Sequence, residues 1–316
     1  WSDQPSFTRA IAQPIGDALR LAAQAVADLS PGAFYHAVAS LALLPGRLLI
    51  ERPIETLVLG LPMILVFVLL GGTISRAAAA EFAEARISDW PEDLRTAASK
   101  TGWGFAAIIA PLAMAGVLIG AIVLGGFTLG VPVLNLLAAL LYAVAILLAL
   151  IALALLLLQA LSLPMLIPAL MCEGTDAFDA VQRCYAYVLA RPLRLLVHAA
   201  LLLLLGLVSI GLFHTIAEGA ESLAHWAAAS KSSDAGVKVL EGGEDLTATQ
   251  PAAHAVIRGW RALVDTAVAG FAFSYFFAAG TVFYLTARRI CDGQGTGDIW
   301  NPDAPENDLT SPPAQA

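Results

Sequence analysis

The sequence predicts an all-α fold, namely a polytopic membrane bundle of about five transmembrane helices. Of its 316 residues, 59% are apolar and only 13% are charged, and the mean hydropathy is +0.77. A soluble domain carries about twice that charged fraction. The charged residues also collect between long uncharged runs, and each of these runs is long enough to cross about 30 Å of hydrocarbon.

Composition and motifs exclude several other classes of protein. So apolar a chain is incompatible with disorder, and three cysteines are too few for a disulfide-rich secreted scaffold. The net charge of -8, with no basic cluster, excludes nucleic-acid binding. The sequence contains no Walker, HExxH, CxxC or GxSxG motif, which ATP-driven transporters, zinc proteases and α/β-hydrolases need. We therefore expect no catalytic residue and no metal site.

The first 53 residues differ from the rest and predict helices that lie in the membrane interface. Residues 15–29 have the pattern of an amphipathic helix, which is expected to end at the Ser-Pro-Gly sequence 30–32. The next apolar stretch, 33–44, is closed by Pro45-Gly46. It is too short to span, so we expect a second interfacial or re-entrant helix. The apolar positions of the first helix are Ile15, Leu19, Ala22, Val26 and Leu29.

Uncharged runs predict the transmembrane helices. No charged residue lies between Lys100 and Glu173, which is enough chain for two crossings, and a glycine- and proline-rich turn at 125–132 divides it. The second half carries two prolines, so we expect that helix to tilt, kink or project from the membrane. The predicted spans are 56–75, 105–124, 134–163, 195–217 and 263–287.

Two polar segments are expected to lie outside the bilayer. The first, 218–259, contains serine- and glycine-rich turns and is predicted to be a polar loop of the transmembrane domain, 54–290. The second is the acidic, proline-rich tail 291–316, which we expect to be flexible unless a partner holds it. The sequence begins at Trp1, so a leader before it stays an open alternative.

The positions of arginine and cysteine predict the orientation in the membrane. Five spans put the two ends of the chain on opposite sides. The compact loops 76–101 and 173–194 contain closely spaced arginines, and short basic loops stay in the cytoplasm. Cys172, Cys184 and Cys291 fall on the same side, where thiols stay reduced. We therefore expect a bacterial inner-membrane protein with a cytoplasmic C-terminus.

Two short segments, 89–95 and 176–183, share a pattern of charges. In each, an aspartate is placed to cap a helix, an acid follows three residues later, and a basic residue comes one turn after that. Each segment precedes a span, so the pattern predicts two parallel hairpin units plus a fifth helix. Many transporters instead have inverted repeats. Ordinary capping chemistry is the alternative explanation.

The stretch 173–183 follows a proline-containing apolar helix and precedes Arg191-Pro192. In this it resembles a feature of uncharacterised bacterial multi-pass proteins, and it is similar to the membrane domain found in some glycerophosphodiester phosphodiesterases. The resemblance covers about thirty residues. It implies a helical membrane bundle and carries over no catalytic residue, because the active site of those enzymes belongs to a separate soluble domain.

Ionisable residues within predicted spans are candidates for function, because they are costly there. His198 and His214 are separated by about 24 Å along a helix, which suits two cofactors near opposite membrane faces, or none. A neutral imidazole can ligate haem or chlorophyll, and a second axial ligand would come from another helix or another subunit. The alternative is a histidine bonded to backbone or headgroups. Asp265 follows Arg261 by four residues, the spacing of an interfacial ion pair.

Small residues in two spans predict close helix packing. Gly116 and Gly120 form a GxxxG motif in the second span. A stripe of small residues runs along the fifth span beside several phenylalanines. These faces serve either to close the chain's own bundle or to bind another subunit. The stripe consists of Thr266, Gly270, Ser274 and Ala278.

Together these observations favour a non-catalytic structural or accessory subunit of a larger bacterial inner-membrane complex. Its expected partners are membrane lipids and other membrane subunits, with no nucleic acid. One alternative is a transporter or lipid-handling permease, which the paired hairpins suggest but which lacks the buried acid usual in such proteins. A second alternative is a haem- or pigment-binding redox or antenna subunit, which rests on the two histidines alone.

Overall fold

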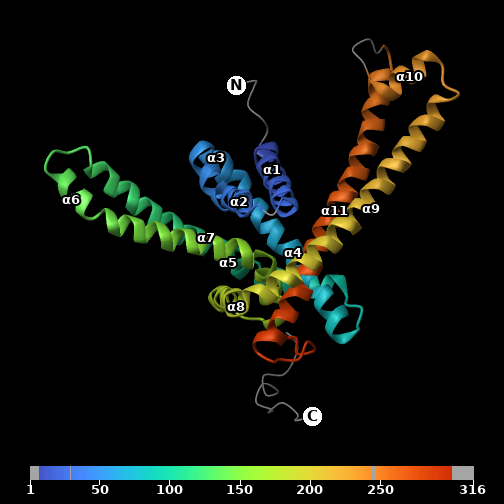
Figure 1. The fold of residues 1–316 in the computed structure, drawn as a ribbon. Helices are drawn as coiled ribbons and strands as arrows, with labels where there is room; N and C mark the ends of the chain where they lie inside the picture. The colour runs from blue at the N-terminus through green and yellow to red at the C-terminus, as the bar shows by residue number, and fades with distance from the viewer. Residues whose placement is uncertain (1–6, 29, 243–246, 301–316) are drawn as a thin grey trace. The chain divides into compact units, whose positions relative to one another are not determined.

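The structure, a computed structural model, describes residues 7–28, 30–242 and 247–300, and every regular element in these ranges is a helix (Figure 1). The chain forms two compact units. Unit 1 comprises Trp1–Pro192 and Gly280–Ala316, and unit 2 comprises Leu193–Ala279. Five helices in the described residues are long and apolar enough to cross a membrane, which confirms the predicted multi-pass helical fold. Their bounds are Pro53–Ala83, Trp90–Thr128, Tyr142–Glu173, Pro192–Ala229 and Gln250–Cys291.

Two helices precede the first span, α1 (Phe7–Ala27) and α2 (Pro31–Glu51), and they pack against each other. Ser30 caps α2, because its hydroxyl oxygen accepts a hydrogen bond from the Ala33 N–H at 3.4 Å. The helix continues past Pro45-Gly46, where the sequence predicts an end. A proline inside a helix removes one backbone hydrogen bond and crowds the carbonyl one turn earlier, but the leucine-rich residues around it favour helix.

The first span is built from three consecutive elements. These are α3 (Pro53–Glu55), a π-helical turn (Thr56–Gly60) and α4 (Leu61–Glu84). The helix therefore extends beyond the predicted 56–75 at both ends. It stops at Ala85, which adopts a left-handed conformation with φ 51°.

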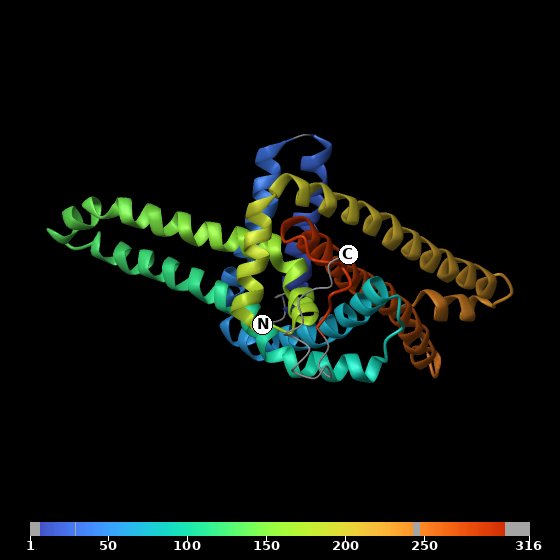
Figure 2. The same ribbon diagram turned by 90° about the horizontal axis from the view of Figure 1, so that it is seen from below.

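Spans two and three form an antiparallel hairpin, and Figures 1 and 2 both show the two helices side by side. The hairpin consists of α5 (Trp90–Thr128), the short α6 (Leu134–Leu140) and α7 (Tyr142–Glu173). The turn lies near its predicted place, although it begins only after Thr128. The predicted span 134–163 is divided at Leu141 and continues to Glu173.

Helix α8 (Ala177–Ala190) follows α7 and is the second of the two predicted capped segments. The Asp176 carboxylate accepts a hydrogen bond from the Asp179 N–H at 2.9 Å, as the sequence predicts. Asp89, at the corresponding position before α5, makes no side-chain capping bond. The two helices also differ in length, because α5 runs on into its span whereas α8 ends at Ala190, before Pro192.

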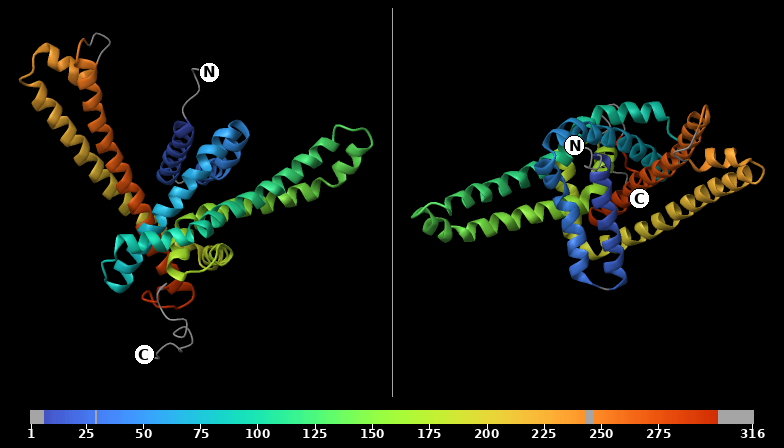
Figure 3. Two further views of the ribbon diagram at one scale, coloured as in Figure 1. Left: turned by 180° about the vertical axis from the view of Figure 1, so that it is seen from behind. Right: turned by 90° about the horizontal axis from the view of Figure 1, so that it is seen from above.

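Unit 2 is formed by parts of α9 (Pro192–Ala229) and α11 (Gln250–Cys291), with α10 (Asp234–Glu241) between them. The two long helices run side by side in Figures 1 and 3. The Tyr275 hydroxyl donates to the Leu202 carbonyl, and Phe213 stacks on Phe271 at 4.8 Å between ring centroids. Most of the predicted polar loop 218–259 is thus helical. Its first residues continue α9, residues 234–241 form α10, and the residues from Gln250 onward begin α11.

The core of unit 1 lies where α4, α5, α7 and the last part of α11 meet. Gly104 of α5 allows close approach to Val68 of α4 and Ile167 of α7, and a Cβ at Gly72 of α4 would lie 2.9 Å from the Met171 side chain. The side chains of Met165, Leu166, Leu170, Tyr284 and Leu285 fill the space between these helices and are buried.

Candidate functional site at the carboxyl end of α7

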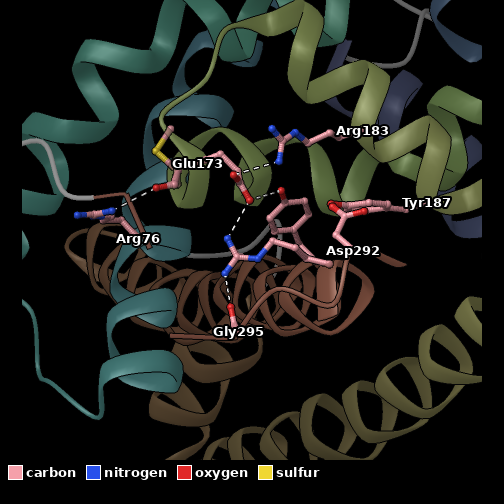
Figure 4. A network of polar contacts seen from close by, with 9 residues as sticks. Arg76, Glu173, Arg183, Tyr187, Asp292 and Gly295 are labelled. Carbon is pink, nitrogen blue, oxygen red and sulfur yellow. Dashed lines mark hydrogen bonds and ion pairs between the residues drawn. The ribbon is translucent and has the colours of Figure 1, made fainter. Parts of the chain in front are cut away.

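Polar side chains from four helices converge on the carboxyl end of α7 in unit 1 (Figure 4). Gly174 ends this helix in a left-handed conformation with φ 64°. The last carbonyl groups of a helix lack partners within it, and they carry the negative end of the helix dipole. Cations are therefore favoured here. We call the following residues the Glu173 network: Arg76, Lys100, Glu173, Arg183, Tyr284 and Arg288.

Glu173 is the centre of this network. Its Oε1 atom accepts hydrogen bonds from Arg288 at 2.8 Å and from the Tyr284 hydroxyl at 2.9 Å, and its Oε2 atom accepts one from Arg183 at 3.2 Å. The side chains of Glu173 and Arg288 are 14% and 2% exposed. A buried ion pair is tolerated only when further hydrogen bonds complete it, and both carboxylate oxygens are used here.

The end of α7 is also neutralised through its main-chain carbonyl groups. Arg76 of α4 donates to the Met171 carbonyl at 3.2 Å, and Lys100 of α5 donates to the Gly174 carbonyl. The Cys172 carbonyl accepts a hydrogen bond from the backbone N–H of Trp300 at 2.8 Å. The free carbonyls of α7 thus tie together α4, α5 and the chain that follows α11.

Residues 292–300, which we call the C-terminal strap, return across this end of α7. Asp292 accepts a hydrogen bond from the Tyr187 hydroxyl, and the Gly295 carbonyl accepts one from Arg288 at 2.7 Å. The Trp300 ring lies against Gly174 and within 5.9 Å of the Arg76 guanidinium and 4.9 Å of the Lys100 ammonium, measured to the ring centroid. The sequence predicts a flexible tail from Cys291, whereas the strap is attached to unit 1. Residues 301–316 lie outside the described residues.

The ionisable groups of α8 favour hydrogen bonding over acid–base chemistry. Burial raises the pKa of Tyr185 to about 12, and burial together with the Asp292 hydrogen bond raises the pKa of Tyr187 further. Burial also raises the pKa of the Cys184 thiol, so it is not an activated thiolate. Burial alone would lower the pKa of Arg183, but the Glu173 carboxylate together with Tyr284 and Tyr187 raises that pKa.

This arrangement can hold these helices together at the end of α7. Each charged side chain of the Glu173 network bonds to another group of the chain. In the part of the chain that the structure describes, no group of three or more His, Cys, Asp or Glu is placed to hold a metal ion.

The histidines predicted as cofactor ligands lie on α9 and bond within their own helix. His198 Nδ1 lies 2.7 Å from the Arg194 carbonyl oxygen, and His214 Nδ1 lies 3.5 Å from a carboxylate oxygen of Glu218, one turn later. The structure does not bring the two rings together. Asp265 is exposed on α11.

The small residues predicted to pack against other helices have few or no neighbours within their own units. In unit 1, no neighbouring heavy atom lies within 4 Å of a Cβ built at Gly116 or Gly120. In unit 2, Gly270 is equally open, Thr266 and Ser274 are exposed, and Ala278 is half-buried. The close helix contacts are instead made at other glycines, namely Gly72, Gly104, Gly206 and Gly280.

Sequence reasoning missed the Glu173 network. One signal was available, because Glu173 and Lys100 are the first charges on either side of the long uncharged stretch and so belong at one membrane boundary. No comparable signal marks Trp300, which lies in a glycine-rich, polar segment.

No family model matches the chain, and no curated protein or solved structure is significantly similar to it. The function is therefore inferred from the geometry.

Proposed function

We propose that the chain is a non-catalytic structural or accessory subunit of a larger bacterial inner-membrane complex. One observation carries this proposal. At the end of α7 the charged side chains bond to one another and to helix carbonyls, whereas the small-residue faces of α5 and α11 are uncovered within their units. A transporter or an enzyme needs polar groups directed toward a substrate, and a scaffold needs uncovered helix surface.

The uncovered face of α5 has the chemistry of a helix-docking surface. Gly116 and Gly120 remove side-chain volume along one line, and this lets a second helix approach closely. Large apolar side chains flank them, with Met114 55% and Val117 67% exposed. In a bilayer such a face contacts lipid or a partner helix, and the glycines favour the helix because close approach gains van der Waals contact.

We also propose that the Glu173 network and the strap lie on the cytoplasmic side. The arginines of the compact loops support this orientation, as does the position of the three cysteines. A reporter enzyme that is active only in the cytoplasm, fused after Ala316, tests it. Activity of the fusion supports the orientation, and activity of a periplasm-specific reporter at the same position contradicts it.

The test of the subunit role is extraction of the full chain from its native membrane in mild detergent, followed by native-gel mass and identification of co-migrating proteins. We expect a complex much larger than 32.9 kDa. Substitution of both Gly116→Leu and Gly120→Leu is expected to release the chain from it, because leucine holds the partner helix away.

The matched control is Gly125→Leu, which adds the same side chain to the same helix at another open glycine. It is expected to leave the complex intact. A single species of 32.9 kDa in the unsubstituted protein contradicts the proposal and favours transport, for which uptake into proteoliposomes is the direct measurement.

A further inference from the structure

The turn end of the α5–α6–α7 hairpin contains a cavity that the Glu173 network does not involve. Its volume is about 410 Å³, within the usual range for small-molecule sites. It lies between the end of α5 and the beginnings of α6 and α7. The residues that define its floor and walls include Ala121, Gly125, Gly126, Ala138, Leu141 and Ala145.

The cavity exists because the helices present little side-chain volume to one another here. A Cβ added at Gly125 or at Gly126 would have no neighbouring heavy atom within 4 Å. The alanines on the opposite helices add only a methyl group each. The interruption at Leu141 between α6 and α7 further prevents the regular interdigitation of side chains that closes a helix pair.

The lining accepts hydrocarbon and little else. No charged residue lies between Lys100 and Glu173, so the cavity has no ionic group. The Thr128 hydroxyl, one of the few polar groups, already donates to the Gly125 carbonyl at 2.6 Å. An apolar cavity of this kind is not filled stably by water, because each water molecule needs several polar partners.

The position of the cavity along α5 indicates which part of the bilayer surrounds it. From Lys100, at the charged end of the hairpin, to Ala121 is about 32 Å along a helix, close to the thickness of the hydrocarbon layer. The cavity therefore lies near the opposite membrane boundary, where lipid chains begin below their headgroups. Tyr142, 60% exposed, is part of the lining and is a residue type that favours this boundary.

We propose that this cavity binds an acyl chain of a membrane phospholipid from the leaflet opposite the C-terminal strap. The glycines and alanines leave room for the chain, and the headgroup lies outside the cavity at the level of the turn. Large apolar side chains on the neighbouring surface, such as Phe127 at 73% exposure, make the surroundings of the opening apolar as well. This site is independent of the proposed subunit role.

The test uses the full chain in phosphatidylcholine vesicles that contain a phospholipid with a photoactivatable diazirine on one acyl chain. Adducts are mapped by peptide mass spectrometry. We expect them to concentrate on peptides from 121–148 compared with lipid-facing peptides of α9. The double variant Gly125→Leu and Gly126→Leu fills the cavity and is expected to lose this enrichment.

The control is Gly102→Leu, because it adds the same side chain to the same helix at an open glycine outside the cavity lining. It is expected to retain the enrichment. Circular dichroism and gel filtration check that both variants fold. Adducts spread evenly over all apolar helices, or crosslinks that join two copies of the chain through 121–148, overturn the proposal.

Discussion

Gly280 of α11 packs directly on the main-chain carbonyl oxygen of Pro164 in α7. Pro168 has no N–H to donate to that carbonyl, so the oxygen lacks its usual partner one turn along the helix. The absence of a side chain at Gly280 lets α11 approach it. The two prolines of α7 therefore do not end the helix, and they create the surface against which the last part of α11 lies.

Replacing Gly280 with alanine is expected to destabilise the protein. The added Cβ would overlap the backbone oxygen of Pro164. Because this oxygen belongs to the main chain, one of the two helices would have to shift to relieve the overlap. Overpacking of this kind costs about 1–3 kcal/mol. Chemical denaturation in detergent micelles measures the loss. Gly270→Ala on the same helix is the control, since its Cβ meets no atom within 4 Å and alanine favours helix. Equal effects of the two substitutions would contradict this account.

Replacing Glu173 with glutamine is expected to be among the most damaging single changes in unit 1. It removes the charge that Arg288 faces at 2.8 Å, and the Arg288 side chain is only 2% exposed. Leaving such a charge without its partner costs about 3–5 kcal/mol. The free energy of unfolding in detergent is the measurement. Glu218→Gln, at an exposed site on α9, is expected to change it little. A Glu173→Gln protein of normal stability would show that the ion pair is not needed.

Replacing Trp300 with alanine is expected to release the C-terminal strap. The ring contacts two cations, and each such contact contributes about 0.5–1 kcal/mol at a partly exposed site. Limited proteolysis should then cut near residues 292–300 faster than in the unsubstituted protein. Trp300→Phe keeps an aromatic face and should be cut at an intermediate rate. Trp226→Ala, at a 68% exposed position, is the control and should leave the cleavage rate unchanged.

Stability is expected to fall at high pH through Tyr185. Its hydroxyl donates to Gln159 at 2.8 Å, and burial raises its pKa from 10.0 to about 12. The folded state holds this proton more tightly than the unfolded state. The stabilising effect is therefore complete below pH 10 and is lost as the pH rises toward 12. Thermal denaturation of the unsubstituted protein and Tyr185→Phe across this window isolates the effect. Parallel pH dependence of the two proteins would contradict it.

The sequence predicts the spans well because hydropathy is a local property. The uncharged runs lie in helices long enough to cross a bilayer, and the cap at Asp176 forms as expected. Helix ends are harder to predict. The segment 218–259 is polar and is nevertheless mostly helical, because polarity alone does not stop a helix whose residues have high helix propensity.

The candidate site is largely invisible in the sequence because it depends on long-range contacts. Arg76, Glu173, Arg288 and Trp300 are far apart in the chain and are brought together only by packing. The small-residue motif at Gly116 and Gly120 is the opposite case, a sequence signal without a corresponding contact. It is conspicuous in the sequence, but the glycines that make close contacts are those whose neighbours lie on other helices.

The buried Gln159 side chain of α7 supplies a hydrogen bond that Pro111 removes from α5. Pro111 has no N–H for the Ala107 carbonyl, one turn earlier in α5. The Gln159 amide of α7 donates to the Ala107 and Ile108 carbonyls, both at 3.3 Å, and Gln159 is 5% exposed. An unpaired carbonyl in an apolar core is costly, so the glutamine stabilises α5 across the helix interface.

This relationship predicts coupling between Gln159 and Pro111. Gln159→Leu alone should cost about 1–3 kcal/mol, because the Ala107 carbonyl is left without a partner. Pro111→Ala supplies the missing N–H within α5, so Gln159→Leu should cost less in that background. A double-mutant cycle on the free energy of unfolding measures the difference. Additive effects would show that the amide does not compensate for the proline. A smaller cost of Gln159→Leu in the Pro111→Ala background would show that the third span supplies the hydrogen bond that Pro111 removes from the second span.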